Sequence, residues 1–144
     1  MTEEPIRVLF LCTGNSCRSQ MAEALLRQRG GERFDVHSAG CIPSGVHPLT
    51  IQALAEMGID AESQCSKHWN VYLHEPPFDY VITVCDYAAQ ICPTFPGEGR
   101  RLHWSFEDPV AVPGSEPERM RAFCRVRDQI GERIQQFVDT ITSR

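Results

Sequence analysis

A nearly continuous apolar run near the start of the chain constrains the fold most strongly. It covers Ile6–Cys12 (IRVLFLC) and leaves almost no position for a solvent-facing side chain. A strand of this kind is typical of a parallel sheet that helices cover on both faces. A helix is predicted behind it over Ser19–Arg29, where apolar residues form one stripe and two glycines follow. Strand, loop and helix in this order indicate an α/β fold.

Strands and helices continue to alternate along the chain. Further strands are predicted at Phe34–Ser38, Tyr80–Cys85 and Arg101–Trp104, and further helices at Pro48–Met57, near Trp69–Leu73, at Asp86–Ile91 with Asp86 as its cap, and at Glu116–Ile141. This order predicts an open four-stranded parallel sheet flanked by helices. Since the chain has 144 residues, we expect residues 1–144 to form a single domain.

Composition and charge exclude several classes of protein. A net charge of -5 does not indicate the positively charged surface that nucleic-acid-binding proteins present. The apolar runs are much shorter than the ~20 residues of a membrane span, and the acidic start does not resemble a signal peptide. Seven cysteines at uneven spacings indicate buried, catalytic or redox-active thiols and not a disulfide framework. We therefore expect a soluble, cytoplasmic monomer with no nucleic-acid or membrane partner.

The loop between the first strand and the first helix carries the chemistry. Cys12 is followed by five residues and then by Arg18 and Ser19. Inward-pointing backbone N–H groups and the positive helix start suit a tetrahedral oxyanion, and the Arg18 fork can hold two of its oxygens. The predicted oxyanion-binding residues are Thr13, Gly14, Asn15, Ser16, Cys17 and Arg18.

Cys12 is the predicted nucleophile of this loop. We expect the positive surroundings to lower the pKa of Cys12, so that it is a thiolate at neutral pH and accepts a hydrogen bond from Ser19. The alternative for a cysteine at a strand end is a small buried hydrophobic residue, and we prefer that interpretation for Cys41, Cys65 and Cys124. Cys17 is interpreted as a packing or bystander thiol.

Three segments resemble a known superfamily. Residues 8–27 (VLFLCTGNSCRSQMAEALLR) resemble the phosphate loop of the low-molecular-weight protein tyrosine phosphatase superfamily. Residues 84–93 (VCDYAAQICP) and 103–109 (HWSFEDP) resemble one branch of it, the thioredoxin-coupled arsenate reductases. The resemblance covers nearly the whole chain and implies the phosphatase-like fold and arsenate as substrate, with phosphate or sulfate as competing oxyanions.

The resemblance also implies a role for each candidate catalytic residue. Cys12 attacks arsenate, assisted by Arg18 and by Asp108 as general acid or base. Cys85 then attacks the adduct, Cys92 attacks Cys85, and thioredoxin reduces the final disulfide. The electrons come from thiols, so no cofactor is needed. Without the resemblance, Asp108–Pro109 would be an ordinary turn and the two later cysteines buried thiols that never pair.

The spacing of Cys85 and Cys92 adds a physical constraint. Seven helical residues rise ~10.5 Å, whereas the Cα atoms of a disulfide lie within ~7 Å. A bond between these cysteines would therefore require the helix between them to unwind. The prolines and glycines that follow it, at residues 93–99, favour cheap local unfolding.

Three alternatives concern metal binding and other functions of the same loop. The five histidines have no ligand spacing, so no metal site is predicted. In some members of the superfamily a monovalent cation is held by residues that match Asn15, Glu23 and Ser38, and here the ammonium of Lys67 could replace it. A tyrosine phosphatase would use the same loop, but Val110 and Ala111 offer no aromatic clamp. A non-catalytic oxyanion or redox sensor is the third possibility.

Overall fold

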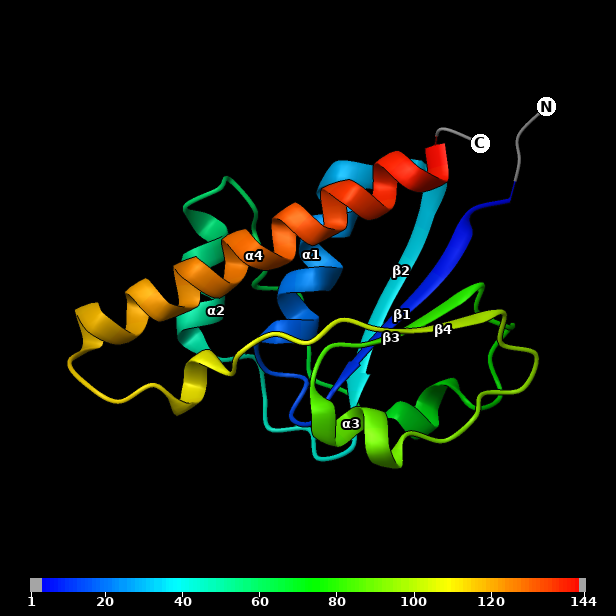
Figure 1. Ribbon diagram of the computed structural model, residues 1–144, viewed down its shortest axis with the longest axis horizontal. Coiled ribbons are helices and arrows are strands. Elements are labelled where there is room, and N and C mark those ends of the chain that lie inside the picture. Colours follow the sequence, from blue (N-terminus) through cyan, green and yellow to red (C-terminus); the bar gives the residue numbers. More distant parts are fainter. Residues whose placement is uncertain (1–3, 143–144) are drawn as a thin grey trace.

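The protein is built on a sheet of four parallel strands. The computed structural model describes residues 4–142. The strands are β1 (Ile6–Cys12), β2 (Phe34–Gly40), β3 (Tyr80–Thr83) and β4 (Arg100–His103), in the order β2-β1-β3-β4 (Figure 1). β1 lies in the centre, with Cys12 opposite Gly40 of β2 and Leu11 opposite Thr83 of β3. The predicted four-stranded α/β fold is confirmed.

Helices cover both sides of this sheet. The α-helices are α1 (Arg18–Gly30), α2 (Pro48–Ala55), α3 (Asp86–Ile91) and α4 (Glu116–Thr142), and the short 3-10 helices are η1 (Gly31–Arg33), η2 (Trp69–Tyr72) and η3 (Pro109–Ala111). Figure 1 shows α1, α2 and α4 on one side and α3 on the other. α1 is buried on almost every side over Ser19–Leu26, because it lies between the sheet and α4.

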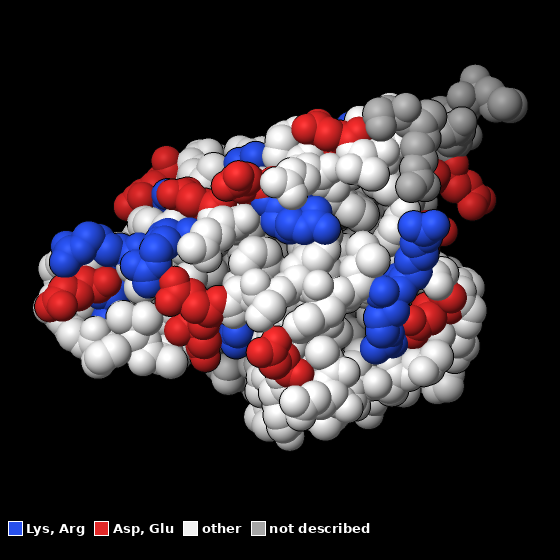
Figure 2. Space-filling model, in the orientation of Figure 1, with Lys and Arg blue, Asp and Glu red and all other residues white. Residues whose placement is uncertain are grey.

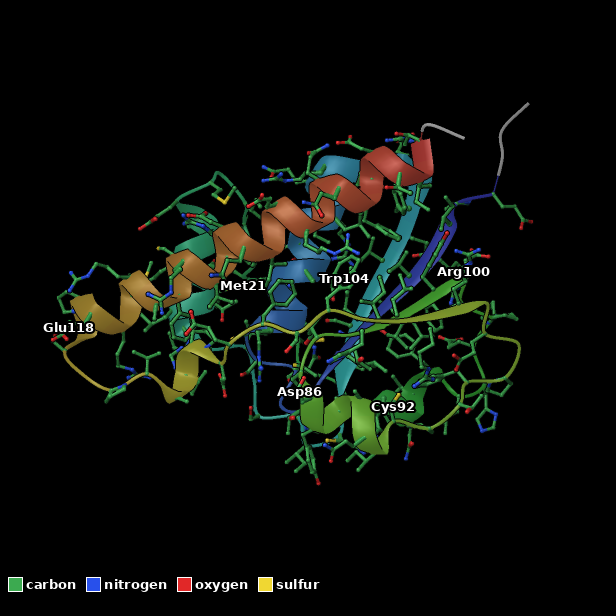
Figure 3. All side chains as sticks on the ribbon, viewed as in Figure 1. Met21, Asp86, Cys92, Arg100, Trp104 and Glu118 are labelled. Atoms are coloured by element: carbon green, nitrogen blue, oxygen red, sulfur yellow. The ribbon has the colours of Figure 1, made fainter. Side chains whose placement is uncertain are left out.

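The core is apolar and continuous across the two layers. The side chains of Met21 and Trp104 lie in the interior between the sheet and the long α4 helix (Figure 3). α4 presents the predicted apolar face, with Phe123, Ile130 and Ile134 fully buried. No helix in the described range 4–142 is both long enough and apolar enough to span a membrane.

Two local predictions around the third strand are wrong. β3 ends at Thr83 and not at Cys85, because the chain turns there into α3. The residue at the start of that helix is Cys85, in an extended conformation and without a side-chain cap. Asp86 does not cap the helix, since its carboxylate accepts hydrogen bonds from His103 at 2.9 Å and Ser105 at 3.1 Å instead.

The remaining boundaries differ from the predicted ones by a few residues. β2 continues two residues further than expected, to Gly40, because its whole length pairs with β1. α1 begins one residue earlier and runs through Gly30, and the break falls at Gly31, whose φ is 63°. Because β2 continues to Gly40, the segment that follows it begins beside the loop after β1.

Candidate active site

The loop after β1 is held open by donors that lie outside it. Its successive carbonyl groups all point outward to these donors: Thr13 O to Ile42 N (2.9 Å), Gly14 O to Ser44 N (3.0 Å) and Ser66 Oγ (2.9 Å), Asn15 O to Gln20 Nε2 (3.1 Å), and Ser16 O to His47 N and Thr50 Oγ1 (both 3.0 Å). With the carbonyls engaged in this way, the intervening N–H groups are free to face the inside of the loop. That arrangement is the one an oxyanion requires.

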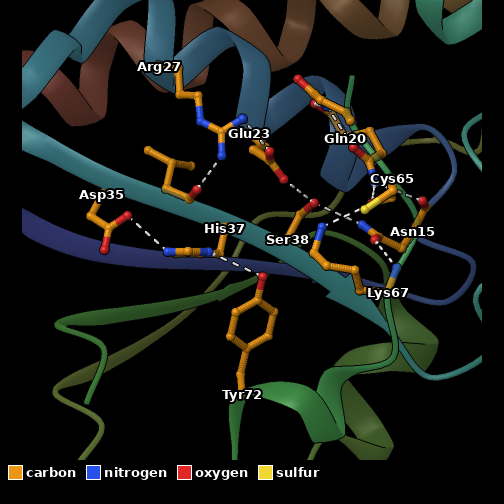
Figure 4. A network of polar contacts seen from close by, with 12 residues as sticks. Asn15, Gln20, Glu23, Arg27, Asp35, His37, Ser38, Cys65, Lys67 and Tyr72 are labelled. Atoms are coloured by element: carbon orange, nitrogen blue, oxygen red, sulfur yellow. Dashed lines mark hydrogen bonds and ion pairs between the residues drawn. The ribbon is translucent and has the colours of Figure 1, made fainter. Parts of the chain in front are cut away.

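Asn15 organises the loop from its centre. It is fully buried and has a φ of 48°, a left-handed conformation that asparagine tolerates better than most residues. Its amide oxygen accepts the Lys67 backbone N–H at 2.9 Å, and its Nδ2 donates to Ser19 Oγ at 2.8 Å and Ser38 Oγ at 3.0 Å (Figure 4). Because the Lys67 N–H can only donate, it fixes which way the amide points.

The Cys12 sulfur lies on the floor of this loop. It is 3% exposed, accepts the Asn15 N–H at 3.2 Å, and lies 2.8 Å from Ser19 Oγ. Ser19 Oγ already accepts a hydrogen bond from Asn15 Nδ2, so its own proton is available for the sulfur. The structure therefore orients Ser19 as the donor to Cys12, which is the direction the sequence predicts.

The ionisation of Cys12 differs from the prediction. Burial raises the pKa of the Cys12 thiol above its ordinary value, and the hydrogen bond from Ser19 and the charge of Arg18 only partly oppose this. The main physical cause is desolvation, because the Cys12 sulfur is buried. The expected lowering of the Cys12 pKa is therefore wrong for this state.

Arg18 has both committed and free donors. Its Nη1 donates to Phe106 O at 3.1 Å, and its Nη2 lies 3.7 Å from Asp108 Oδ2. Its Nε is buried and makes no hydrogen bond with the described residues. Since unpaired buried donors are costly, Nε–H is a donor suited to a bound anion.

Asp108 lies next to the loop through this pair with Arg18. Its Oδ1 also accepts the Val110 N–H at 3.0 Å, so it caps η3 as an ordinary Asp-Pro turn would. The side chain is 44% exposed. The turn fixes the backbone and leaves the second carboxylate oxygen facing Arg18.

A buried polar chain continues behind the loop. Ser38 Oγ donates to Glu23 Oε1 at 2.5 Å, and Glu23 Oε2 pairs with Arg27 Nη1 at 2.5 Å (Figure 4). Arg27 also donates to Val36 O at 2.8 Å. The positive charge nearest this carboxylate is thus the guanidinium of Arg27, whereas Lys67 Nζ donates to Cys65 O at 2.9 Å. No cluster of three or more metal-ligating side chains is found within residues 4–142.

The two later cysteines bracket α3. Cys85 is buried at its start, with Sγ 3.3 Å from Thr13 Oγ1, the residue after Cys12. Cys92 is half-buried at its end, with its N–H on Ala88 O at 2.9 Å. Figure 3 shows Asp86 and Cys92 at the two ends of the helix. The structure therefore places Cys85 next to the loop and Cys92 one short helix away from it.

The remaining cysteines are less buried than predicted: Cys65 is exposed, so its interpretation as a buried hydrophobic residue is wrong, and Cys41 and Cys124 are partly buried. Cys17 directly precedes α1 and is 3% exposed, and burial raises its pKa above the ordinary value. The residues that sequence reasoning missed are the donors and acceptors that fix the loop from a distance: Ile42, Ser44, His47, Thr50, Ser66 and Phe106. No local pattern marks them, since they act through backbone atoms or common hydroxyls.

Comparison with known proteins places this site in a family. Residues 7–144 match the family described as low molecular weight phosphotyrosine protein phosphatase. An arsenate reductase of Bacillus licheniformis is 46% identical over 134 residues, which are 92% of this chain and 95% of that protein. The chain belongs to the arsenate reductases of this family.

Solved structures of arsenate reductases agree with that assignment. One, in a phosphate-binding state, superposes with a TM-score of 0.79 at 32% identity, over 94% of this chain and 98% of that one. A thioredoxin-dependent arsenate reductase of Corynebacterium glutamicum superposes with a TM-score of 0.74 at 30% identity, over 98% of this chain and 64% of that one. The predicted family and fold are confirmed.

Proposed function

We propose that this enzyme reduces arsenate to arsenite with its own cysteines and is regenerated by thioredoxin. The observation that carries the proposal is the position of Cys85, whose sulfur lies beside Thr13 at the mouth of the loop that holds Cys12. A phosphatase needs only the loop. A second thiol at the mouth is what a reductase needs in addition.

The first step is displacement at arsenic. The unpaired Nε–H of Arg18 and the inward N–H groups hold the arsenate dianion, which receives the proton of the Cys12 thiol. The sulfur bonds to arsenic and the displaced oxygen leaves as water, with Asp108 placed to assist this proton transfer. Arsenic remains in the +5 state in this adduct, so no electrons have yet been transferred to it.

The second step transfers the electrons. The thiolate of Cys85 attacks the Cys12 sulfur of the adduct, so a Cys12–Cys85 disulfide forms while the sulfur–arsenic bond breaks. Its electron pair stays on arsenic, which leaves as arsenite after taking up protons. Thr13 Oγ1, at 3.3 Å, is placed to donate a hydrogen bond to that thiolate.

The third step moves the disulfide outward. Cys92 attacks Cys85, forms Cys85–Cys92 and releases Cys12. The new bond then exchanges with the thiols of thioredoxin, the reductant named for the Corynebacterium glutamicum relative. The half-buried position of Cys92, compared with the buried Cys12, supports this direction of transfer.

A count of thiols separates the three candidate functions. The reductase loses two thiols per arsenate when no reductant is present, whereas a phosphatase or a non-catalytic sensor loses none. Arsenite production with thioredoxin, thioredoxin reductase and NADPH, compared with glutathione and glutaredoxin, identifies the reductant. Turnover with glutathione alone would contradict the thioredoxin part, and an unchanged thiol count would contradict the reductase.

Cysteine variants test the order of steps. Cys12→Ser abolishes reduction and any phosphatase activity, because a hydroxyl is far harder to ionise. Cys92→Ser completes one turnover and stops at Cys12–Cys85, whereas Cys85→Ser stops at the arsenic adduct. Both later variants keep phosphatase activity, which serves as the control for folding. Undiminished multiple turnover by Cys92→Ser would contradict the relay.

A further inference from the structure

The end of α3 is tied to the edge of the sheet by Arg101. The carbonyl of Pro93, the residue after Cys92, accepts Arg101 Nη2 at 2.8 Å. The Cys92 thiol donates to the same carbonyl at 3.3 Å. The guanidinium and the sulfur therefore share one acceptor, and the positive charge is next to the sulfur.

Glu98 holds this guanidinium in place. Its two carboxylate oxygens accept Arg101 Nη2 at 2.6 Å and Nε at 3.0 Å. Glu98 is itself fixed, because its Oε1 accepts the Phe95 N–H at 2.8 Å and its side chain is only 12% exposed. Figure 2 shows the basic side chains of this edge beside acidic ones. We call the pair of Arg101 and Glu98 the clamp. It belongs to β4 and the turn before it, and not to the helix that has to unwind.

We propose that Arg101 is a positioning residue that holds Cys92 at the sheet edge and stabilises its thiolate for attack on Cys85. The proposal rests on the relay proposed above. It assigns to an edge-strand arginine, outside the oxyanion loop, the activation of the third thiol.

The electrostatics of Cys92 support this assignment. Burial raises the pKa of the Cys92 thiol, and the carboxylate of Glu98 and the thiol of Cys41 raise it further. The hydrogen bond and the charge of Arg101 act in the opposite direction. Without Arg101, the half-buried Cys92 thiol would lie near the carboxylate of Glu98 with no positive charge from the clamp to compensate.

The step that Arg101 assists is a thiol-disulfide exchange with no net oxidation. Cys92 loses its proton to solvent, and its thiolate attacks the Cys85 sulfur of the Cys12–Cys85 bond. The Cys85–Cys92 bond forms, the Cys12–Cys85 bond breaks, and Cys12 leaves as a thiolate that takes up a proton. The rate depends on the thiolate fraction of Cys92, and therefore on its pKa.

The pH dependence of alkylation at Cys92 tests the assignment without any turnover. Reduced protein is treated with iodoacetamide over a range of pH, and labelling of the peptide that contains Cys92 is followed by mass spectrometry. Arg101→Gln slows labelling near neutral pH by roughly tenfold, the equivalent of one pKa unit. Arg101→Lys keeps the charge and gives an intermediate rate. Glu98→Gln removes the opposing charge and accelerates labelling.

Arg100 provides the matched control. It is exposed, lies on the same strand one position earlier, and makes no part of the clamp described above. Arg100→Gln removes the same charge from the surface and leaves the Cys92 profile unchanged. If Arg101→Gln and Arg100→Gln gave the same profile, the assignment to Arg101 would be overturned.

A single-turnover measurement connects the assignment to the relay. Arg101→Gln forms Cys12–Cys85 at the wild-type rate but forms Cys85–Cys92 about tenfold more slowly, and raising the pH restores that rate. One outcome would overturn the relay, and with it the role of Arg101 in the relay. In that outcome Arg101→Gln shifts the alkylation profile of Cys92, but the wild-type enzyme forms no Cys85–Cys92 bond when arsenate is added. An unshifted profile with an intact relay would overturn the role of Arg101 alone.

Discussion

Oxidation of Cys85 and Cys92 should unwind α3 and leave the rest of the fold in place. These residues flank the helix at its first and last positions. In the helix their Cα atoms are ~10.5 Å apart, and a disulfide allows ~7 Å. The ends must therefore approach by at least about 3.5 Å. The hydrogen bonds Ala89 N–H to Cys85 O (3.2 Å) and Cys92 N–H to Ala88 O (2.9 Å) cannot both survive.

The helix is held weakly enough for this. All of α3 is described by the structure, and Ala88 is its one buried side chain. Burying a single methyl group contributes about 1 kcal/mol, and each backbone hydrogen bond contributes about 1 kcal/mol net. Local opening of α3 therefore costs only a few kcal/mol.

Hydrogen exchange on reduced and oxidised protein measures this change. The amides of Ala89 and Cys92 are protected in the reduced protein and exchange fast in the oxidised one, whereas α4 and the sheet keep their protection. The amide of Phe95 stays protected as well, since it donates to the fixed Glu98. Cys92→Ser under the same oxidant is the control, because it cannot form the bond. Unchanged protection of Ala89, with the disulfide confirmed by mass, would refute the reasoning.

Three further substitutions test other parts of the structure. Gly40→Ala places a Cβ 2.5 Å from Thr13 O, a backbone atom that cannot move aside. We expect denaturant unfolding to show a loss of ~1–3 kcal/mol in the free energy of unfolding. We also expect calorimetry to show that the variant no longer binds sulfate. Ser19→Ala removes the donor to Cys12, so alkylation of Cys12 slows by roughly tenfold near neutral pH. Asp86→Ala removes the hydrogen bond between α3 and His103, so we expect the amides of α3 to exchange faster even in the reduced protein. Glu118→Ala, on the distant helix α4, is the control.

The elements and the nucleophile could be predicted from the sequence because their signals are local. The apolar run Ile6–Cys12, the helix behind it and the cysteine that ends the run occupy one stretch of chain. The end of β3 differs from the predicted one by two residues, because the apolar character of Val84–Cys85 continues after the ladder stops. Burial there comes from packing and not from strand pairing, and an apolar pattern does not distinguish the two.

The ionisation of Cys12 could not be predicted from residue types alone. Burial of the Cys12 sulfur raises its pKa by more than the hydrogen bond from Ser19 and the charge of Arg18 lower it, and burial depends on packing from distant parts of the chain. In this structure Phe106 O and Asp108 take up two nitrogens of Arg18, and they lie 88 and 90 positions along the chain from it. The same holds for the donors that fix the loop carbonyls, which are near in space but distant in sequence.

The outward-held carbonyls have a consequence for selectivity. Because six external donors and the buried Asn15 amide fix the loop, its shape does not depend on what enters it. A preorganised cradle of this kind pays little ordering entropy on binding, but it also cannot reject an anion of similar size and symmetry. Under the proposed relay, discrimination between arsenate and the abundant phosphate falls on the electron transfer. Arsenic(V) keeps the electron pair of its bond to Cys12 when Cys85 attacks the sulfur, and phosphorus(V) does not. Phosphate therefore delays the enzyme by occupancy and does not consume its thiols.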